Sequence, residues 1–332
     1  PASATQFLAR LKRLGLKPGL PFAVLGFGDR QFPRFCQYAH QVQDAMVQAG
    51  GTPLLGLETV NRQSSQEFAR WGDALAVPLG HDLPLIHTAQ RPSTCQLELS
   101  ERIVYGEAVN APTHVLRFKA KGGLPRFQAG DLVGIFLPDN PAPRFYSLAS
   151  CADDGVLEIC VRKHPGGLCS GFLHDLEIGG SVEAFIQPNP QFRPASGAHP
   201  VILIGAGTGI GPLAGFIRHN TAKHPMHLYW GGRNPASDFL YEPELNRYLA
   251  DHRLTALRAA FSQVQDRSYV QDRLLSDALA LRRLIEKGAQ VLVCGSREMA
   301  KGVMHALDEV LAPLNLSVQA LKTQGRYRED VY

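Results

Sequence analysis

The sequence lacks the features that mark membrane-spanning, disulfide-stapled and metal-cluster proteins. No apolar run in its 332 residues approaches the roughly 20 residues that a membrane helix needs, and no signal peptide follows Pro1. The six cysteines stand apart, with no Cys-x-x-Cys motif and no Cys/His pair at metal-ligand spacing. We therefore expect no bound metal and a reducing, cytoplasmic compartment. Whether a segment upstream of Pro1 tethers the chain to a membrane is left open.

A basic surface stripe is also missing. The net charge is only +4, and the Lys and Arg residues are scattered along the chain. This pattern argues against a nucleic-acid partner and fits small molecules that carry phosphate. The apolar fraction of 45% is enough to fill a core in each of two ordinary domains. We therefore expect a globular, multidomain protein.

The pattern in the first part of the chain predicts an incomplete α/β domain. Helix and strand signals alternate over residues 1–79, but only two strands, over 21–25 and 52–57, are clear. Two strands are too few for a stable parallel sheet. Residues 80–92 are rich in Pro and His without a period, and this composition predicts a linker.

The rest of the chain predicts two further domains. Over residues 93–195, short and partly alternating segments lie between Gly and Pro turns about ten residues apart. This spacing is typical of an antiparallel structure, and we predict a six-stranded barrel. Over 196–332, strands alternate with helices, which predicts a doubly wound parallel sheet.

The segment Arg144-Phe145-Tyr146-Ser147-Leu148 has the side chains that a flavin needs. A flavin takes an aromatic face beside its ring, a hydrogen-bond donor near N5 and a guanidinium on its pyrophosphate. Strand alternation places Arg144 and Tyr146 on one face and Phe145 and Ser147 on the other. An ordinary barrel strand with a surface arginine would show the same pattern.

A second segment, Gly166-Gly167-Leu168-Cys169-Ser170, follows a strand and opens a helix. Backbone N–H groups and the Ser170 hydroxyl at such a helix start would cradle a phosphate at the positive end of the helix dipole. A plain Gly-Gly turn is the alternative. We assign Cys160 and Arg162, at the end of the preceding strand, to the same cofactor site.

A third segment is the glycine-rich turn Gly205-Ala-Gly-Thr-Gly-Ile-Gly-Pro212 after an apolar strand. It departs from the G-x-G-x-x-G fingerprint, because Ile210 stands three positions beyond Gly207. The form G-x-G-T-G-x-x-P suits a nicotinamide and its phosphates at the carboxyl end of a parallel sheet. We assign Gly207, Thr208 and Gly209 to cofactor binding; a turn that binds nothing is the alternative.

Polar residues after two later strands suggest a site for the 2'-phosphate of a nicotinamide cofactor. These residues are Arg233, Ser262, Arg267, Tyr269 and Gln271. A solvated loop is the alternative, and for Gln271 alone it is the favoured one.

Two features near the end of the chain extend the predicted site. Cys294-Gly295 ends a buried strand and brings a thiol to the rim where a nicotinamide would lie, although a buried cysteine is often only a small apolar residue. The last residues combine the aromatic ring of Tyr332 with Asp330 two positions earlier. Terminal segments are normally frayed. An aromatic last residue could instead cover a flavin ring until nicotinamide displaces it.

The order of these motifs resembles that of the NADPH-dependent diflavin reductases, the family that contains NADPH-haemoprotein reductase and the flavoprotein subunit of sulfite reductase. The matching motifs are R-F-Y-S-L, G-G-L-C-S, G-A-G-T-G-I-G-P, Y-W-G-G-R, F-L-Y-E-P-E-L, Y-V-Q-D-R-L, V-C-G-S and G-R-Y-R-E-D-V-Y, all within residues 93–332. The resemblance implies a module like ferredoxin-NADP reductase, with an FAD-binding barrel at 93–195 and an NADP-binding sheet at 196–332.

The resemblance also implies a role for each site residue. Arg144, Tyr146 and Ser147 would hold FAD, residues 167–170 would contact its pyrophosphate, and Tyr332 would lie over its ring.

For the nicotinamide cofactor, the implied roles fall on later residues. Ser147, Cys294 and Asp330 would surround the hydride path, while Thr208 and the polar residues from 233 to 271 would hold NADPH.

Residues 1–79 resemble the second half of the flavodoxin-like FMN domain of that family. Gly28, Asp29, Phe32 and Phe35 fall in the loop that flanks the FMN ring in the family. The first half, with the phosphate loop, is absent from this sequence, so FMN binding by this chain stays open.

Two further departures from the family bear on the enzyme. The large helical insertion that many members carry before the R-F-Y-S-L motif is reduced here to a handful of residues. Gln263 stands where the family usually has an arginine on the 2'-phosphate. A charged hydrogen bond is worth roughly 1.5 to 3 kcal/mol, so we expect a weakened preference for NADPH over NADH, without reversal.

The function that this resemblance implies is transfer of hydride from NADPH to FAD, followed by single electrons to an FMN domain or a haem protein. Two alternatives stay open. One is a stand-alone NAD(P)H-dependent flavin or ferric reductase, and the other is a redox-inactive binding module that keeps the fold.

Overall fold

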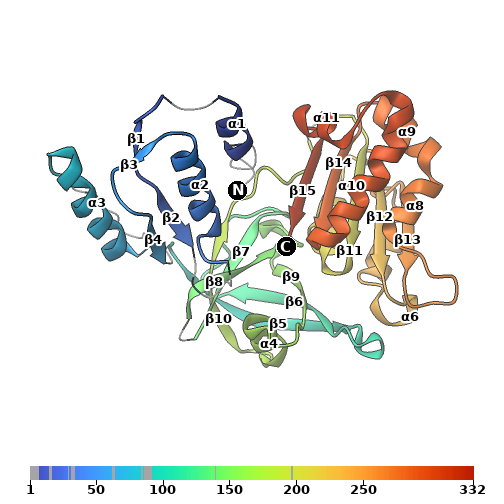
Figure 1. Cartoon of the computed structure of the whole chain (residues 1–332). Coiled ribbons are helices and arrows are strands. Elements are labelled where there is room, and N and C mark those ends of the chain that lie inside the picture. The colour runs from blue at the N-terminus through green and yellow to red at the C-terminus, as the bar shows by residue number, and fades with distance from the viewer. Residues whose placement is uncertain are drawn as a thin grey trace. The chain divides into compact units, whose positions relative to one another are not determined.

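The computed structural model describes residues 7–14, 17–28, 30, 34–61, 64–83, 85, 92–138, 140–195 and 197–332. The chain divides into two compact units, Pro1–Pro92 and Ser93–Tyr332 (Figure 1). No helix in the described ranges is both long and apolar enough to cross a membrane.

The first unit contains short helices and two pairs of parallel strands. Its elements are α1 (Phe7–Leu14), β1 (Pro21–Phe22), β2 (Leu25–Gly28), α2 (Gln37–Gln48), β3 (Thr52–Pro53), β4 (Glu58–Asn61) and α3 (Ser65–Leu79). Strand β1 pairs with β3, and β2 pairs with β4. The sequence did not predict β4, because only Val60 of its four residues is apolar and buried.

The second unit begins with a six-stranded antiparallel sheet, counted over the described residues. Its strands are β5 (Cys95–Tyr105), β6 (Thr113–Ala120), β7 (Leu132–Leu137), β8 (Asn140–Ser147), β9 (Leu157–Arg162) and β10 (Ser181–Gln187). They lie in the order β8-β7-β10-β5-β6-β9, and a bridge between Leu148 and Ile159 joins the two end strands. The predicted number of strands and their antiparallel pairing are confirmed. Helix α4 (Leu168–Asp175) follows β9.

A five-stranded parallel sheet follows, again as counted in the described part of the chain. Its strands are β11 (Val201–Ala206), β12 (Met226–Gly232), β13 (Ala256–Phe261), β14 (Gln290–Gly295) and β15 (Tyr327–Val331). The order β13-β12-β11-β14-β15 puts the first strand at the centre, as expected where crossovers run in both directions. The predicted parallel sheet is confirmed.

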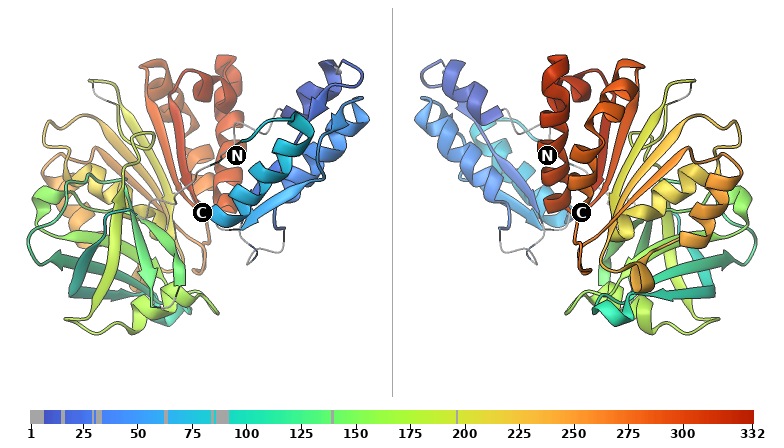
Figure 2. Two further views of the ribbon diagram at one scale, coloured as in Figure 1. Left: turned by 90° about the vertical axis from the view of Figure 1, so that its left-hand side faces the viewer. Right: turned by 90° about the vertical axis from the view of Figure 1, so that its right-hand side faces the viewer.

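Helices cover both faces of the parallel sheet. They are α5 (Ile210–Arg218), α6 (Pro235–Asp238), α7 (Glu242–Ala250), α8 (Val270–Ser276), α9 (Ala278–Glu286), α10 (Arg297–Leu311) and α11 (Val318–Thr323). Val201 and Leu203 pack in one core with α5 and α7, whereas Ile202 and Ile204 pack in another with α8 to α11. Alternate residues of a central strand therefore serve two cores, and Figure 2 shows the two helix layers.

A buried charge cluster joins the two sheets. Glu158 on β9 is fully buried, with its Oε2 2.5 Å from Nε of Arg117 on β6 and its Oε1 2.9 Å from Nη2 of Arg218 on α5. The Tyr241 hydroxyl, just before α7, donates to the same Oε1 at 3.1 Å. One carboxylate thus connects the antiparallel sheet to two elements that cover the parallel sheet.

Candidate functional site

The ends of β8 and β9, the start of α4, the glycine turn after β11 and the end of the chain surround one pocket of about 270 Å³. Most of the residues predicted to bind a cofactor line it. They are Arg144, Phe145, Tyr146, Ser147, Cys160, Arg162, Gly167, Leu168, Cys169, Ser170, Thr208, Cys294 and Tyr332. These residues are up to 188 positions apart in sequence (332 minus 144), and the fold brings them together.

The hydroxyl of Ser147 is fixed by Asp330. Ser147 Oγ donates to Asp330 Oδ2 at 2.6 Å. Burial raises the pKa of Asp330, and the bond from Ser147 opposes that rise. Asp330 pairs in register with Cys294 on the neighbouring strand, and burial raises the pKa of the Cys294 thiol. The three residues predicted to surround the hydride path therefore form one continuous group.

The terminal ring of Tyr332 lies at the pocket and is held by its hydroxyl. Its Oη is 2.5 Å from Thr208 Oγ1 in the glycine turn, and its backbone N–H donates to the carbonyl of Gly295. Tyr332 is 57% exposed, so the ring is held at one end but not packed into the core. This arrangement fits the predicted role of Tyr332, whose ring would lie over a flavin and move away when nicotinamide binds there.

The glycine turn is shaped by its neighbours. Gly207 has φ of +53°, and a Cβ there would lie 2.8 Å from Arg162 Nη2. A Cβ on Gly209 would collide with the carbonyl oxygen of Cys294. Any side chain at these positions would push the turn away from β14 or from Arg162. The turn therefore lies against both the thiol-bearing strand and a pocket cation.

At the start of α4, the Ser170 hydroxyl is bonded within its own loop, whereas the predicted phosphate cradle would use it to bind phosphate. The Ser170 hydroxyl accepts from the backbone N–H of His164 at 3.2 Å and donates to the carbonyl of Gly167 at 3.2 Å, so it closes the loop. A Cβ on Gly167 would lie 2.5 Å from this hydroxyl. His164 also lines the pocket, and no motif in the sequence indicated it.

The residues predicted to hold the 2'-phosphate lie elsewhere. None of the five, all within the described ranges, lines the pocket. Arg233 and Ser262 directly follow β12 and β13, and the Ser262 N–H donates to the carbonyl of Gly232, the last residue of β12, at 3.1 Å. Arg233 Nη1 donates to Val109 O at 2.8 Å, so one face of this guanidinium is already engaged.

The other three of these residues follow β13. Arg267 and Tyr269 are exposed, Tyr269 to 51%, whereas Gln271 at the start of α8 lies near Gly302 of α10. Exposed rings and guanidinium groups at the carboxyl edge of a parallel sheet are accessible to a nucleotide.

The candidate FMN loop lies in the first unit and is described only in part. A Cβ on Gly28 would lie 2.9 Å from Cys36 Sγ and 3.0 Å from the Phe35 ring. The end of β2 is thus packed against the start of α2. Asp29 and Phe32 lie outside the described residues.

Two stacked histidines lie behind the start of α4. The rings of His114 on β6 and His174 on α4 are 3.7 Å apart between centroids, and both residues are buried. His174 Nε2 is 3.0 Å from the carbonyl oxygen of Val161. This pair connects the helix that carries the predicted phosphate cradle to the antiparallel sheet.

Lowering the pH from 7 to 5 is expected to lower the melting temperature. Burial first, and then the charge of His174, lower the pKa of His114 to about 4, and burial lowers that of His174. An unfolded histidine titrates near 6.5, so stability is lost as the pH falls through the window between about 6.5 and 4, at about 1.4 kcal/mol per pKa unit. His114→Phe should flatten the profile of melting temperature against pH, whereas His305→Gln, at an exposed position of α10, should not. Equal slopes in both variants would contradict this assignment.

Comparisons with known proteins agree with this geometry. The model of the oxidoreductase NAD-binding domain matches residues 203–305. The flavoprotein alpha-component of NADPH sulfite reductase from Mannheimia succiniciproducens is 36% identical over 215 residues, which cover 57% of this chain and 36% of that protein. The same component from Serratia proteamaculans is 34% identical over 229 residues, covering 61% of this chain and 38% of that protein.

The parallel sheet and its glycine turn carry the match to the oxidoreductase NAD-binding domain, and residues of both sheets line the pocket. Over the aligned region, the chain is similar to the flavoprotein alpha-components of NADPH sulfite reductase. The resemblance predicted from the motifs is confirmed. The aligned region spans little more than a third of the length of these curated relatives.

Proposed function

We propose that this chain takes hydride from NADPH onto FAD and passes single electrons to an FMN domain or a haem protein. The observation that carries this proposal is the single pocket in which Ser147, Cys294, Thr208 and Tyr332 meet, with Asp330 bonded to Ser147. The curated relatives are named as flavoprotein components of sulfite reductase that use NADPH, which supports an electron-accepting haem protein as the partner class.

The residues of the pocket fit the ring part of FAD. The volume of about 270 Å³ is close to the lower end of small-molecule sites, so it suits a ring system better than a whole dinucleotide. The buried Nε of Arg162 has no hydrogen-bond partner among the residues that the structure describes, and a buried, unpaired donor favours a bound acceptor. Phe145 is 46% exposed, and its ring is held edge-on by Phe185 at 5.8 Å.

Within this proposal, each group of residues has a defined task. The bound FAD supplies the hydride acceptor and releases electrons singly. Arg144, Tyr146 and the start of α4 hold the cofactor, while Ser147 presents a hydroxyl whose position Asp330 fixes. Tyr332 excludes water from the ring until nicotinamide arrives. The protein thus acts mainly by orientation, which is worth several kcal/mol.

NADPH is proposed to bind at the carboxyl edge of the parallel sheet. Its phosphates would meet the turn at 207–209, and its 2'-phosphate would meet Arg233, Arg267 and the ring of Tyr269. Ser262 and Gln271 are the other two residues that the sequence predicts at this 2'-phosphate site. These groups follow the ends of adjacent strands, which supports a single extended nucleotide site.

The proposed domain limits are 1–79 for the flavodoxin-like part, 80–92 for the linker, 93–195 for the FAD domain and 196–332 for the NADP domain. We propose that the first part is the second half of a flavodoxin-like domain. The parallel pairing of β1 with β3 and of β2 with β4 supports this. FMN binding by this chain stays open, since the phosphate loop of such a domain is not in the sequence.

Anaerobic mixing with NADPH tests the proposed function. The purified protein should be yellow, and its flavin absorbance should bleach on mixing with NADPH. Reduction of a haem protein should then require an added FMN domain. Direct reduction of ferric iron or free flavin at the same rate would favour the stand-alone reductase, and a colourless protein that takes up no FAD would favour the redox-inactive module.

Replacing both Arg233 and Arg267 with Gln is expected to abolish the preference for NADPH over NADH. Each charged hydrogen bond to the 2'-phosphate is worth roughly 1.5 to 3 kcal/mol, which is about ten- to 150-fold in affinity. The ratio of kcat/KM for NADPH to that for NADH measures the effect. Arg258→Gln removes an exposed arginine of the same sheet that pairs with Asp277, and should leave the ratio unchanged. An unchanged ratio in the double variant would refute the assigned 2'-phosphate site.

A further inference from the structure

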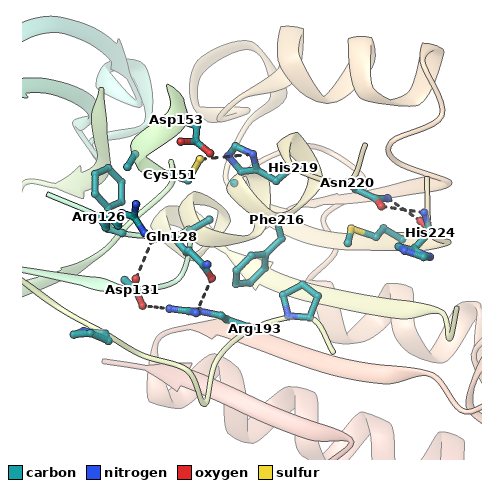
Figure 3. Close-up of a pocket in the computed structure, with 17 residues that line it drawn as sticks. Arg126, Gln128, Asp131, Cys151, Asp153, Arg193, Phe216, His219, Asn220 and His224 are labelled. Carbon is teal, nitrogen blue, oxygen red and sulfur yellow. Dashed lines mark hydrogen bonds and ion pairs between the residues drawn. The ribbon is translucent and has the colours of Figure 1, made fainter. Parts of the chain in front are cut away.

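A second pocket of about 770 Å³ shares no lining residue with the cofactor pocket, and two potential metal ligands, Cys151 and His219, line it (Figure 3). They belong to a group of three such residues. The group consists of Cys151, Asp154 and His219. Cys151 precedes the single-turn helix Ala152–Asp154, Asp154 is the last residue of that helix, and His219 is the first residue after α5. His219 lies 65 residues beyond Asp154, so the sequence spacing gave no sign of this cluster.

The ligand atoms are close to the geometry of a zinc site. Cys151 Sγ is 3.8 Å from His219 Nδ1, and Asp154 Oδ2 is 3.0 Å from His219 Nε2. One atom from each side chain can be chosen so that all three lie within 4.8 Å of one another. With bond lengths near 2.0 to 2.3 Å, tetrahedral ligands lie about 3.5 Å apart. The two distances involve different ring nitrogens of His219, and an ion would take only one of them, so binding requires the exposed ring of His219 to turn.

The local charge favours a cation. Asp154 Oδ2 accepts from the backbone N–H of Cys151 at 2.8 Å and lies 3.0 Å from His219 Nε2, so the carboxylate is held beside the thiol and the imidazole. The carboxyl end of α5 carries the negative end of its helix dipole. Arg218 Nη1 is 3.5 Å from Asp154, but Arg218 is also bound to Glu158 and to the carbonyl of Ala149.

The pocket supplies access and room for a further ligand. Cys151 and His219 both line it, and Figure 3 shows the sulfur facing the imidazole. A protein site with three ligands and an adjacent open cavity can hold water as its fourth ligand. Thiolate, imidazole and carboxylate together are the donors that borderline-soft divalent ions prefer.

We propose that Cys151, Asp154 and His219 bind a divalent ion of the zinc class. The ion would link the loop after β8 to the carboxyl end of α5. It would thereby connect the antiparallel sheet to a helix that covers the parallel sheet. Binding releases the thiol proton of Cys151, since the ligand is the thiolate. This site is independent of the cofactor pocket and of the proposed electron transfer.

Titration calorimetry with zinc chloride tests the site on the purified, metal-stripped full chain. We expect one ion per chain. Cys151→Ser and His219→Gln should each weaken binding about 100-fold, because even loss of an outer-shell partner typically costs ten- to 100-fold in metal affinity. Cobalt(II) used in place of zinc should give an absorption band from thiolate ligation that Cys151→Ser removes. The melting temperature should rise with zinc in the parent chain but not in Cys151→Ser or His219→Gln.

The controls separate this site from surface chelation. Cys95→Ser removes another partly exposed thiol, and His305→Gln breaks the exposed His305–Glu309 pair on α10. Both should bind zinc as the parent does. Absence of saturable binding in the parent, or equal affinity in parent and Cys151→Ser, would overturn the proposal. Circular dichroism of each apo-variant checks that folding is retained.

Discussion

Replacing Glu158 with Ala is expected to lower the free energy of unfolding by about 3 to 5 kcal/mol. The carboxylate is fully buried between Arg117 and Arg218, and it also accepts from the Tyr241 hydroxyl. Removing this carboxylate takes from Arg117 and Arg218 their one fully buried partner and leaves only Glu101 and Glu244 near Arg117 and Asp154 near Arg218, in surroundings that solvate charge poorly. Urea unfolding of the parent and of the variant, followed by circular dichroism, measures the difference.

An exposed acid on the same sheet provides the matched control. Glu98 lies 3.8 Å from Lys121, and both side chains face solvent. Exposed ion pairs contribute about 0 to 1 kcal/mol, so Glu98→Ala should change stability by no more than that. A loss below about 1 kcal/mol in Glu158→Ala would show that solvent or rearranged side chains replace the carboxylate, contrary to this account.

Replacing Asp330 with Asn is expected to slow reduction of the flavin by NADPH about 100-fold. Asp330 fixes the Ser147 hydroxyl through a bond of 2.6 Å, and positioned proton-bearing groups contribute about 10² to 10⁴ in rate. Burial raises the pKa of Asp330. Acidification should therefore protonate Asp330 and lower the parent rate. This fall should begin at a higher pH than the one at which an ordinary aspartate titrates. The variant should lack that dependence. Stopped-flow absorbance at a series of pH values measures both.

Glu329→Gln is the control for Asp330. Glu329 is the preceding residue of β15, and its carboxylate pairs with Lys322 at 3.1 Å. The same loss of one charge on the same strand should leave the reduction rate unchanged. FAD content and the affinity for NADPH should be equal in all three proteins, which separates slow hydride transfer from cofactor loss. A rate within twofold of the parent in Asp330→Asn would exclude Asp330 from the hydride site.

The sequence predicted the two sheets of the second unit because their signals are local. Gly and Pro turns divide the antiparallel strands, and the central parallel strands are continuous apolar runs such as Val201–Ala206. The sequence predicts a tail where the edge strand β15 lies, because only Tyr327 of its five residues is buried. Its place depends on pairing with β14, which no local pattern encodes.

Convergence of the site residues was predictable only in part. The strand end at Ser147 and the turn at Thr208 were indicated by the motifs, but the bonds to Asp330 and Tyr332 depend on register between distant strands. Side-chain partners such as the carbonyl that engages Arg233 also depend on a distant loop. The assignment of individual residues to FAD and NADPH stays a prediction, which the variants above test.

The bond between Ser147 and Asp330 joins residues 183 positions apart, and this separation has a kinetic consequence. Closing so long a loop is entropically costly, so such contacts form after local turns and hairpins have formed. The reaction centre should therefore be among the last regions to mature during refolding. Recovery of flavin binding after dilution from urea should lag behind recovery of secondary structure.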